Sequence, residues 1–443
     1  MKKLSLLLAA LCILSINACK KSSSDNQTTP TKSTFKIAVL SDIHYMDPSL
    51  LVHDGPAFQA YLKMDRKLLA ESDAILRESV TELLVSKPDL VLISGDLTKD
   101  GELISHQSVA GLISQLINAG IKVRVTVGNH DVNNPHALKY DGTNATRVPS
   151  VRADDIKSIY ANSGYGDALY SDPNSLSYVS EPIPNLWLIT IDAAEYYNNN
   201  DSTDVTEGII KPETMTWALA RLAEANLKGK TVIGMMHHGI LEHFSGQATM
   251  FSEYVVDNWS TVSDQLMNAG LKIMFTGHFH ANDIVKKATG NNFLFDIETG
   301  STVTYPCPYR VITYVKDSTL AITTNHITTI NYAGLNGQPF ATYAKNALQA
   351  GMDTISKLTL MAPPYYAPAP IAMAVAPRMR NAMMAHYAGD ESLSADENAL
   401  IQATIAQAGA LGPILNLYLM SLWTDLTPKD NTLTINLKTG SSN

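Results

Sequence analysis

Cysteine is scarce in this sequence of 443 residues, which contains only Cys12, Cys19 and Cys307. Two of the three lie in the first 19 residues, so the rest of the chain holds a single thiol with no partner for an internal disulfide. A fold held together by disulfides and a zinc centre built from thiolates are therefore both excluded. We expect Cys307 to be a packed residue and the stability of the fold to come from its apolar core.

Long runs of positive charge are also absent. The net charge is −9, and no run of Lys or Arg is longer than three residues, so a stable complex with nucleic acid is not expected. A glycine-rich dinucleotide fingerprint is missing as well. The stretch GKT at 229–231 is not a phosphate-binding loop, because Glu224 stands where that motif needs its first glycine. The hydrophobic share of 45% is ordinary for a soluble globular protein of two or three domains.

The apolar stretch near the N-terminus, residues 4–16, is too short for a comfortable membrane span. It follows two lysines and precedes small residues and Cys19, so residues 1–19 resemble the signal peptide of bacterial lipoproteins. In that interpretation the thiol of Cys19 carries a lipid that anchors the chain in a membrane, and residues 20–33 form a flexible tether. We expect an exported lipoprotein of the cell envelope, in the outer membrane. An ordinary signal peptide or an uncleaved anchor is the alternative.

After the tether, short apolar runs alternate with amphipathic segments. This alternation is typical of a layered α/β fold, in which buried strands are followed by loops and covering helices. The strand-like runs are 35–41, 89–95, 122–128, 186–192, 231–237 and 271–277. The helical segments between them are 57–85, 102–118, 212–227 and 260–269.

The last third of the chain has two different patterns. Residues 291–328 contain three strand-like runs with short turns, which indicates antiparallel strands that complete the sheets. From about residue 335, long segments rich in alanine and methionine are typical of helices, and a last strand is expected near 432–439. We therefore divide the mature chain into an α/β domain, 34–330, and a mainly helical region, 331–443, packed on it.

Polar residues follow five of the apolar runs, directly where each predicted strand ends. In an α/β sheet the carboxyl ends of the strands form one edge, where ligands bind, so these residues should meet in space. Each short pattern alone is common, but the five together and in order are not. The residues are Asp42 and His44; Asp96; Asn129, His130 and Asp131; His237; and His278 and His280.

The residue types in this set suit hard or borderline metal ions. Carboxylate and amide oxygens and neutral imidazoles bind Mn, Fe, Zn, Co or Ni, and the absence of thiolates argues against a structural zinc site. Seven ligands are too many for one tetrahedral ion but fit two divalent ions that share a carboxylate. Two ions roughly 3.5–4 Å apart can clamp both oxygens of an in-line displacement and hold a bridging hydroxide as the nucleophile. This chemistry points to hydrolysis of an ester at phosphorus.

The order D-x-H, GD, GNHD, H and GHxH resembles that of the calcineurin-like metallophosphoesterase superfamily, over about residues 35–328. The resemblance implies a four-layer α/β/β/α sandwich, with residues 34–330 as the catalytic domain. It also implies which residues hold which ion. One ion would be held by Asp42, His44 and His280, the other by Asn129, His237 and His278, and Asp96 would bridge them. His130 would contact the phosphate and assist the leaving group, with Asp131 orienting its imidazole.

Some positions depart from relatives. Lys99 occupies the place of the tyrosine ligand of purple acid phosphatases, so that subclass is rejected, and His238 is not expected to be a ligand. Weaker candidates for the substrate pocket are Tyr45, Asp47, His53, His106, His136 and Arg310. We expect a small phosphodiester as substrate. Monoesters and pyrophosphates, hydrolysed at the same site, remain open, and a catalytically silent binding lipoprotein is a further alternative.

Overall fold

The computed structural model describes residues 32–363 and 365–443, and Thr34–Asn443 form one compact unit. The predicted signal peptide, the lipidation site Cys19 and the tether up to residue 31 lie outside the described residues. Within the described part of the chain, none of the helices combines the length and the apolar character needed to cross a membrane.

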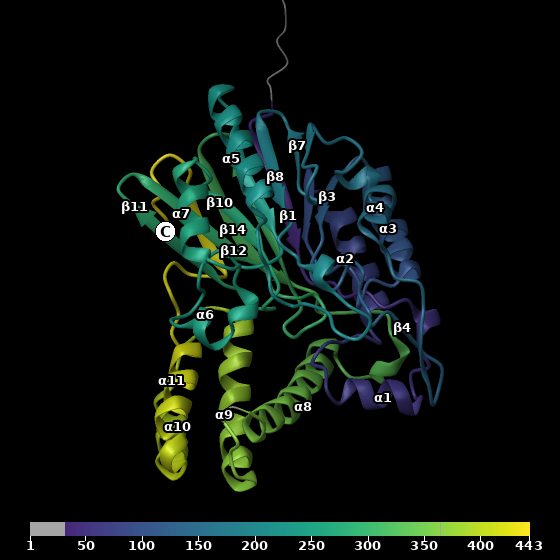
Figure 1. The fold of residues 1–443 in the computed structure, drawn as a ribbon, viewed down its shortest axis with the longest axis vertical. Helices are drawn as coiled ribbons and strands as arrows, with labels where there is room; N and C mark the ends of the chain where they lie inside the picture. Colours follow the sequence, from purple (N-terminus) through teal and green to yellow (C-terminus); the bar gives the residue numbers. More distant parts are fainter. Residues whose placement is uncertain (1–31, 364) are drawn as a thin grey trace, which may run out of the picture. The chain divides into compact units, whose positions relative to one another are not determined.

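Two large sheets form the centre of the protein (Figure 1). The first has the order β15-β14-β13-β1-β2-β3, with β1 (Thr34–Leu40), β2 (Leu90–Ser94), β3 (Lys122–Thr126), β13 (Pro308–Val315), β14 (Thr319–His326) and β15 (Thr432–Asn436). The second has the order β11-β12-β10-β9-β8-β7-β6, with β6 (Tyr170–Ser171), β7 (Tyr178–Ile183), β8 (Leu186–Ile191), β9 (Thr231–Met236), β10 (Ile273–Thr276), β11 (Ile284–Thr289) and β12 (Asn292–Glu298). In the first sheet β1, β2 and β3 are parallel, and in the second β8, β9, β10 and β12 are parallel, so within each set the carboxyl ends lie at one edge.

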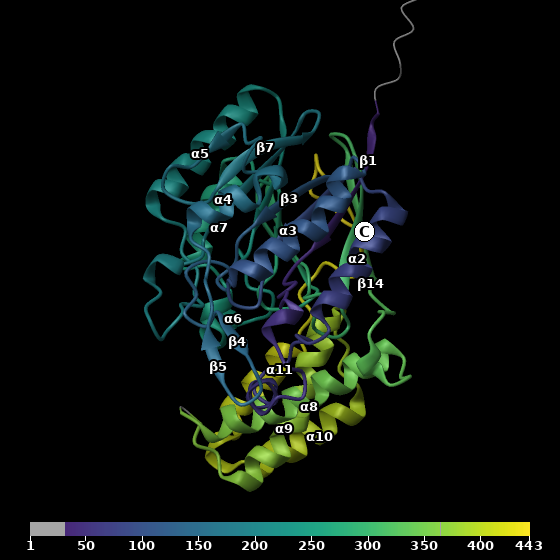
Figure 2. The same cartoon turned by 90° about the vertical axis from the view of Figure 1, so that its right-hand side faces the viewer.

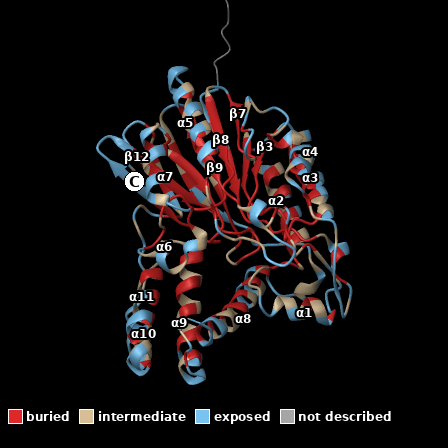
Figure 3. Cartoon of the chain, in the orientation of Figure 1, coloured by how far each residue is buried: buried red, intermediate tan, exposed pale blue. Residues whose placement is uncertain are grey.

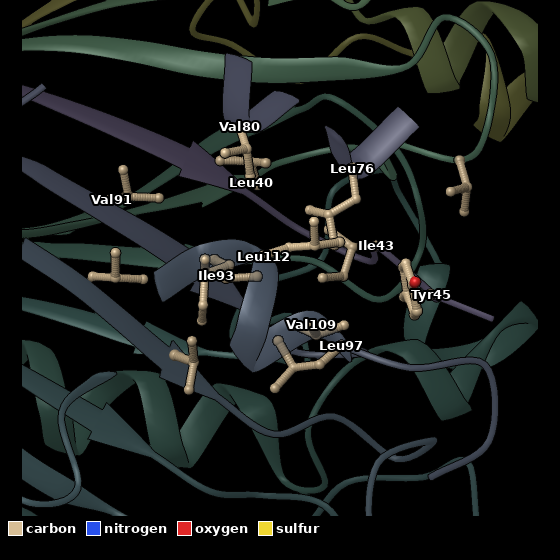
Figure 4. Close-up of a cluster of buried hydrophobic side chains, with 14 of the residues drawn as sticks. Leu40, Ile43, Tyr45, Leu76, Val80, Val91, Ile93, Leu97, Val109 and Leu112 are labelled. Atoms are coloured by element: carbon tan, nitrogen blue, oxygen red, sulfur yellow. The ribbon is translucent and has the colours of Figure 1, made fainter. Parts of the chain in front are cut away.

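Helices cover the outer faces of both sheets, as the sequence predicts. The helices are α2 (Ser72–Ser86) and α3 (Leu103–Asn118) on the first sheet, and α5 (Pro212–Leu227) and α7 (Trp259–Asn268) on the second. Apolar residues three or four apart on α2, such as Ile75, Leu76, Val80 and Leu83, face the first sheet because that spacing follows the helical period (Figure 4). A separate apolar cluster fills the space between the sheets. The four-layer α/β/β/α architecture is confirmed, with central strands such as β2, β8 and β10 fully buried (Figure 3).

Two sequence-based predictions about elements are wrong. The helix expected over 57–85 is broken into α1 (Pro56–Leu62) and α2, and the polar segment 63–71 joins them. In that segment the carboxylate of Asp65 accepts a hydrogen bond from the backbone N–H of Lys67 at 2.8 Å, a local turn that competes with the helix. The three runs in 291–328 are indeed strands, but they are not all antiparallel to their neighbours: β12 runs parallel to β10 in the second sheet, whereas β13 and β14 are antiparallel strands of the first.

The C-terminal helices gather at one end of the two sheets (Figures 1 and 2). They are α8 (Phe340–Met361), α9 (Ala369–Ala388), α10 (Ala395–Gln407) and α11 (Gly412–Leu422). Their apolar core includes Phe244, Phe279 and Ala281 from the α/β part, so the helices pack on that part directly. The chain then returns through β15, which pairs with β14 in antiparallel register. The helices are thus an excursion between two neighbouring strands of the first sheet.

Candidate dinuclear metal centre

The predicted ligand residues lie in the loops that follow β1, β2, β3, β9 and β10. Five of them have positive backbone φ angles, which residues other than glycine rarely adopt. The five are Asp42 (49°), His44 (34°), Asp96 (48°), His278 (79°) and His280 (68°). Such strained backbone persists only where the surrounding structure imposes it, and it gathers at functional sites.

The first group of side chains consists of Asp42, His44 and His280. The Nε2 atoms of the two imidazoles face each other at 3.0 Å, and Asp42 Oδ1 lies 3.4 Å from Nε2 of His280 and 3.8 Å from Nε2 of His44. The other ring nitrogen of His280, Nδ1, contacts Thr304 Oγ1 at 3.0 Å, which fixes the ring. Three buried donor atoms that converge in this way fit a cation between them.

The second group consists of Asp96, His237 and His278. Asp96 Oδ2 lies 3.2 Å from Nε2 of His237, whose Nδ1 donates to the backbone carbonyl of Ser94 at 2.9 Å. His278 Nε2 donates to the carbonyl of Glu253 at 3.0 Å, which leaves its Nδ1 lone pair for the centre. Burial alone would lower the pKa of His237, but the nearby carboxylate of Asp96 outweighs this effect, and the pKa is raised to about 10. The Asp96 carboxylate therefore stabilises positive charge at this position, as a cation site requires.

Asp96 connects the two groups, because it lies near His44 of the first as well as His237 of the second. Its Oδ2 lies 3.5 Å from Nε2 of His44 and 3.2 Å from Nε2 of His237, while its Oδ1 accepts the backbone N–H of His130 at 3.0 Å. The nearby Asn129 is buried, and both polar atoms of its amide lack a hydrogen-bond partner. A buried amide without partners is costly, which fits a side chain that completes a metal site. The residues present therefore fit two ions joined by one carboxylate.

Two glycines let the loops approach this closely. A Cβ atom on Gly128 would lie 2.1 Å from Asp96 Oδ1, and one on Gly277 would lie 1.9 Å from Ser41 Oγ and 2.5 Å from Asp42 Oδ2. Any side chain at either position would displace a carboxylate of the centre.

The comparison with protein families agrees with this geometry. The family profile of the calcineurin-like phosphoesterases matches residues 35–282, more than half of the chain. The chain belongs to the calcineurin-like phosphoesterase family. It is a metal-dependent phosphoric ester hydrolase, in a family whose members depend on two metal ions.

Solved structures with a similar fold share little sequence with this phosphoesterase. A dimetal phosphatase from Danio rerio is 16% identical, with a TM-score of 0.47, and the match covers 66% of this chain and 96% of that one. A purple acid phosphatase from yellow lupin (Lupinus luteus) is 10% identical, with a TM-score of 0.39, and the match covers 67% of this chain and 52% of that one. The comparison with curated proteins finds no match.

His130 of this phosphoesterase lies beside the centre, but its orienting partner differs from the one predicted. Its Nδ1 contacts Asp100 Oδ1 at 2.7 Å, and its Nε2 lies 4.0 Å from Asp96 Oδ2. Although burial opposes it, the negative charges of Asp96 and Asp100 raise the pKa of His130. Asp100 also forms a buried ion pair with Lys99, the residue that replaces the purple-phosphatase tyrosine. Lys99 is thus a partner of Asp100 and does not join either group of ligands.

The predicted contact between Asp131 and the His130 imidazole is wrong. The Asp131 carboxylate accepts hydrogen bonds from the backbone N–H groups of Leu97, Thr98 and Gly128 at 3.1, 3.0 and 2.9 Å. It thereby ties the loop after β2 to the loop after β3. The resemblance implied Asp131, the neighbour in sequence, whereas the neighbour in space is Asp100, from the GDLTKDGE loop.

The weaker candidates lie outside the two ligand groups. Arg310 is fully buried and donates to the backbone carbonyls of Glu298 and Asp283, so it is a structural crosslink. His238 Nε2 donates to the carbonyl of Thr206 and, as expected, is outside both groups. The remaining candidates pair locally: Tyr45 with Asp73, Asp47 with Ser49 and Ser108, His53 with Asp54, His106 with Tyr160, and His136 with Asp204.

Two cations near the centre escaped the sequence analysis. Burial and then the positive charge of Lys67 lower the pKa of His44, and the charges of Arg66 and Lys67 also act on His280. Both cations lie in the segment 63–71 that interrupts the expected helix. The only sign in the sequence that this segment contributes to the site is the unusual length of the chain between the first and second motifs.

Proposed function

We propose that this protein is a dinuclear phosphoesterase whose seven predicted ligands hold two divalent ions. The observation that carries this proposal is the position of Asp96 Oδ2, within 3.5 Å of an imidazole from each group. The ligands would be Asp42, His44 and His280 for one ion, Asn129, His237 and His278 for the other, and Asp96 for both. When bound, such a pair supplies Lewis acidity and an activated water near neutral pH. Mn, Fe, Zn, Co and Ni all suit this oxygen and nitrogen set.

His130 would act on the leaving group. The negative charges of Asp96 and Asp100 raise the pKa of His130 and so favour its protonated form, and the hydrogen bond from Nδ1 to Asp100 leaves the Nε2–H free to face the substrate. From there it would bind a phosphoryl oxygen and give its proton to the departing alkoxide. Asp100 is then a positioning residue, and Asp131 supports the loops.

A phosphodiester is the substrate class that the charge near the centre favours. The charge of Lys67 acts on His44 and His130 and that of Arg66 acts on His280, but Lys67 lies 3.6 Å from the carboxylate of Asp65 and is partly neutralised. A singly charged diester needs less positive charge than a doubly charged monoester. Phosphomonoesters and pyrophosphates on the same ligands are the alternative.

A metal-loaded substrate panel tests this function. The protein is prepared with Mn²⁺, Zn²⁺ or Co²⁺, its metal content is measured, and hydrolysis of mono-, di- and cyclic phosphoesters is followed in the wild type and in Asp96→Ala. We expect close to two ions per chain, preference for diesters, and loss of both activity and one ion in Asp96→Ala. Two bound ions without turnover of any phosphoester would instead indicate a silent binding protein.

We also propose that the mature protein is exported and anchored by a lipid on Cys19, with the outer membrane as its destination. Support comes from the lysines, the apolar run and the small residues before Cys19. Mass spectrometry of the mature N-terminus and fractionation of Cys19→Ser test it. A Cys19→Ser variant that is cleaved and remains in the membrane like the wild type would contradict the anchor.

A further inference from the structure

A cavity of about 540 Å³ lies between the α/β part and the C-terminal helices. Its wall on the α/β side includes Phe251, Tyr254 and Phe279, and its wall on the helical side includes Met352 and Ile355 of α8. Residues of α9 and α11, which both lie below the short helix α6 (Gln247–Met250) in Figure 1, also line the cavity. The size and the aromatic and methionine lining are those of a site for an organic ligand.

This cavity adjoins the proposed metal centre. The ring of Tyr254 lies 4.7 Å from the ring of His278, and the carbonyl of the neighbouring Glu253 accepts the His278 Nε2–H. Phe279 stands between the two ligands His278 and His280 in sequence, and its ring packs on Tyr254 at 4.7 Å. The segment that carries two ligands is therefore also a wall of the cavity.

Arg66 brings a positive charge to the wall of the cavity. It is one of the cavity's lining residues, its guanidinium lies 6.0 Å from the ring of Tyr387, and its charge acts on His280. Its buried Nε–H has no hydrogen-bond partner. A cation with a free donor at the edge of an apolar cavity is suited to a phosphoryl oxygen whose ester group lies in that cavity.

We infer that this cavity binds a hydrocarbon group of the phosphoester substrate, an alkyl or acyl chain or an aromatic ring, while its phosphoryl group lies at the metal centre beside Arg66. The inference rests on the proposed function and names the class of substrate for that site. The C-terminal helices then take part in substrate selection, since α8, α9 and α11 supply most of the helical wall. The flexible methionines Met379 and Met383 let that wall adapt to groups of different shape.

The inference is tested by varying the length of the alkyl group on the substrate. Methyl, butyl and octyl 4-nitrophenyl phosphodiesters share a leaving group, so differences in kcat/KM report the other ester group. Burial of each added methylene predicts a rise of about two- to fourfold while the chain stays inside the cavity. If the enzyme accepts only monoesters, methyl and octyl phosphate are compared by phosphate release. A kcat/KM that does not change with chain length would overturn the inference.

A matched pair of variants on α8 locates the effect. Ile355→Trp fills the cavity, and Leu358→Trp places the same side chain on the same helix at an exposed position that is not part of its lining. We expect the octyl-to-methyl ratio of kcat/KM to fall at least tenfold in Ile355→Trp and to stay at the wild-type value in Leu358→Trp. Equal ratios in both variants would place the chain elsewhere, and if Ile355→Trp does not fold, the series in the wild-type protein decides.

Binding measurements separate this inference from the proposed function. Calorimetry with octylphosphonate and methylphosphonate reports the cavity without turnover. Tight binding of the octyl compound by a metal-loaded protein that hydrolyses no phosphoester would reject the function and retain the cavity. Equal, weak binding of both compounds by an active enzyme would retain the function and reject the cavity.

Discussion

Replacing Asp100 with asparagine separates the positioning of His130 from its chemistry. The amide in Asp100→Asn would keep the shape of the side chain and one acceptor oxygen, but it would remove the charge that faces the imidazole at 2.7 Å. The pKa of His130 should fall, because Asp100 is one of the charges that raise it. Less of the enzyme would then carry the Nε2 proton that the leaving group needs.

The expected loss follows from the strength of this contact. A hydrogen bond to a charged group contributes about 1.5–3 kcal/mol, which corresponds to a factor of roughly 10 to 150 in kcat. The loss should be large for a diester with an alkyl leaving group and small for one that releases 4-nitrophenolate, since a good leaving group departs without a proton. The basic region of the activity profile should also move to lower pH.

A double-mutant cycle with His130→Ala tests this argument. If Asp100 acts only through His130, Asp100→Asn should have little further effect on kcat in the His130→Ala background. Thermal unfolding of all four proteins controls for the buried partner Lys99, whose ion pair with Asp100 is altered in both backgrounds. Equal losses with and without His130, or equal losses for both leaving groups, would refute the positioning role.

Further predictions concern metal, pH and packing. Chelation should lower the unfolding temperature by several degrees, because cations no longer compensate the buried carboxylates, and a thermogram that EDTA leaves unchanged would contradict the metal centre. Burial raises the pKa of Glu298 to about 8 from its ordinary value of 4.5, so between these values the folded state keeps a proton that the unfolded state releases. The unfolding temperature should therefore fall as the pH rises from about 5 to 8, and Glu298→Gln should flatten that decline. The same decline in the variant and the wild type would exclude Glu298 as its source. A chain lacking residues 431–443 loses the two buried apolar side chains of β15, which contribute about 3–6 kcal/mol to the free energy of unfolding. It should be largely insoluble, because that is a large share of the stability of a folded domain. A soluble, active product would show that the edge strand is dispensable. Gly128→Ala should abolish most activity, because the added methyl group would displace the Asp96 carboxylate. The control Gly111→Ala lies in open space on α3 and should be neutral or slightly stabilising. Normal activity in Gly128→Ala would mean that the close approach of Gly128 to Asp96 is not needed.

The order of elements and the site's location could be predicted because both depend on local pattern. Strands such as β1 and β10 are short apolar runs that end at polar residues, and parallel neighbours bring those ends to one edge. The positive φ angles of Asp42 and His280 could not be predicted, because only the converging loops impose them.

Contacts between separate loops could not be predicted from the sequence. Asp131 is adjacent to His130 in the chain, but three backbone N–H groups occupy its carboxylate and leave Asp100 to face the imidazole. The position of Lys67 depends in the same way on a break in a predicted helix. The division of β12 and β13 between two sheets is likewise decided by pairing, because β12 pairs with β10 whereas β13 pairs with β1, far away in sequence.

The return of the chain through β15 has a consequence for how such enzymes diversify. The helices α8–α11 leave from β14 and rejoin its neighbour, so their two attachment points are adjacent strands on the side of the sheet away from β3. Phe279 and Ala281, which flank the ligand His280, belong to the apolar core of these helices, so a replacement excursion would have to keep its contacts with them to leave the ligand loops in place. Under the inferred role of the cavity, an excursion of that kind, grafted onto a related core, should transfer substrate preference without rebuilding the centre.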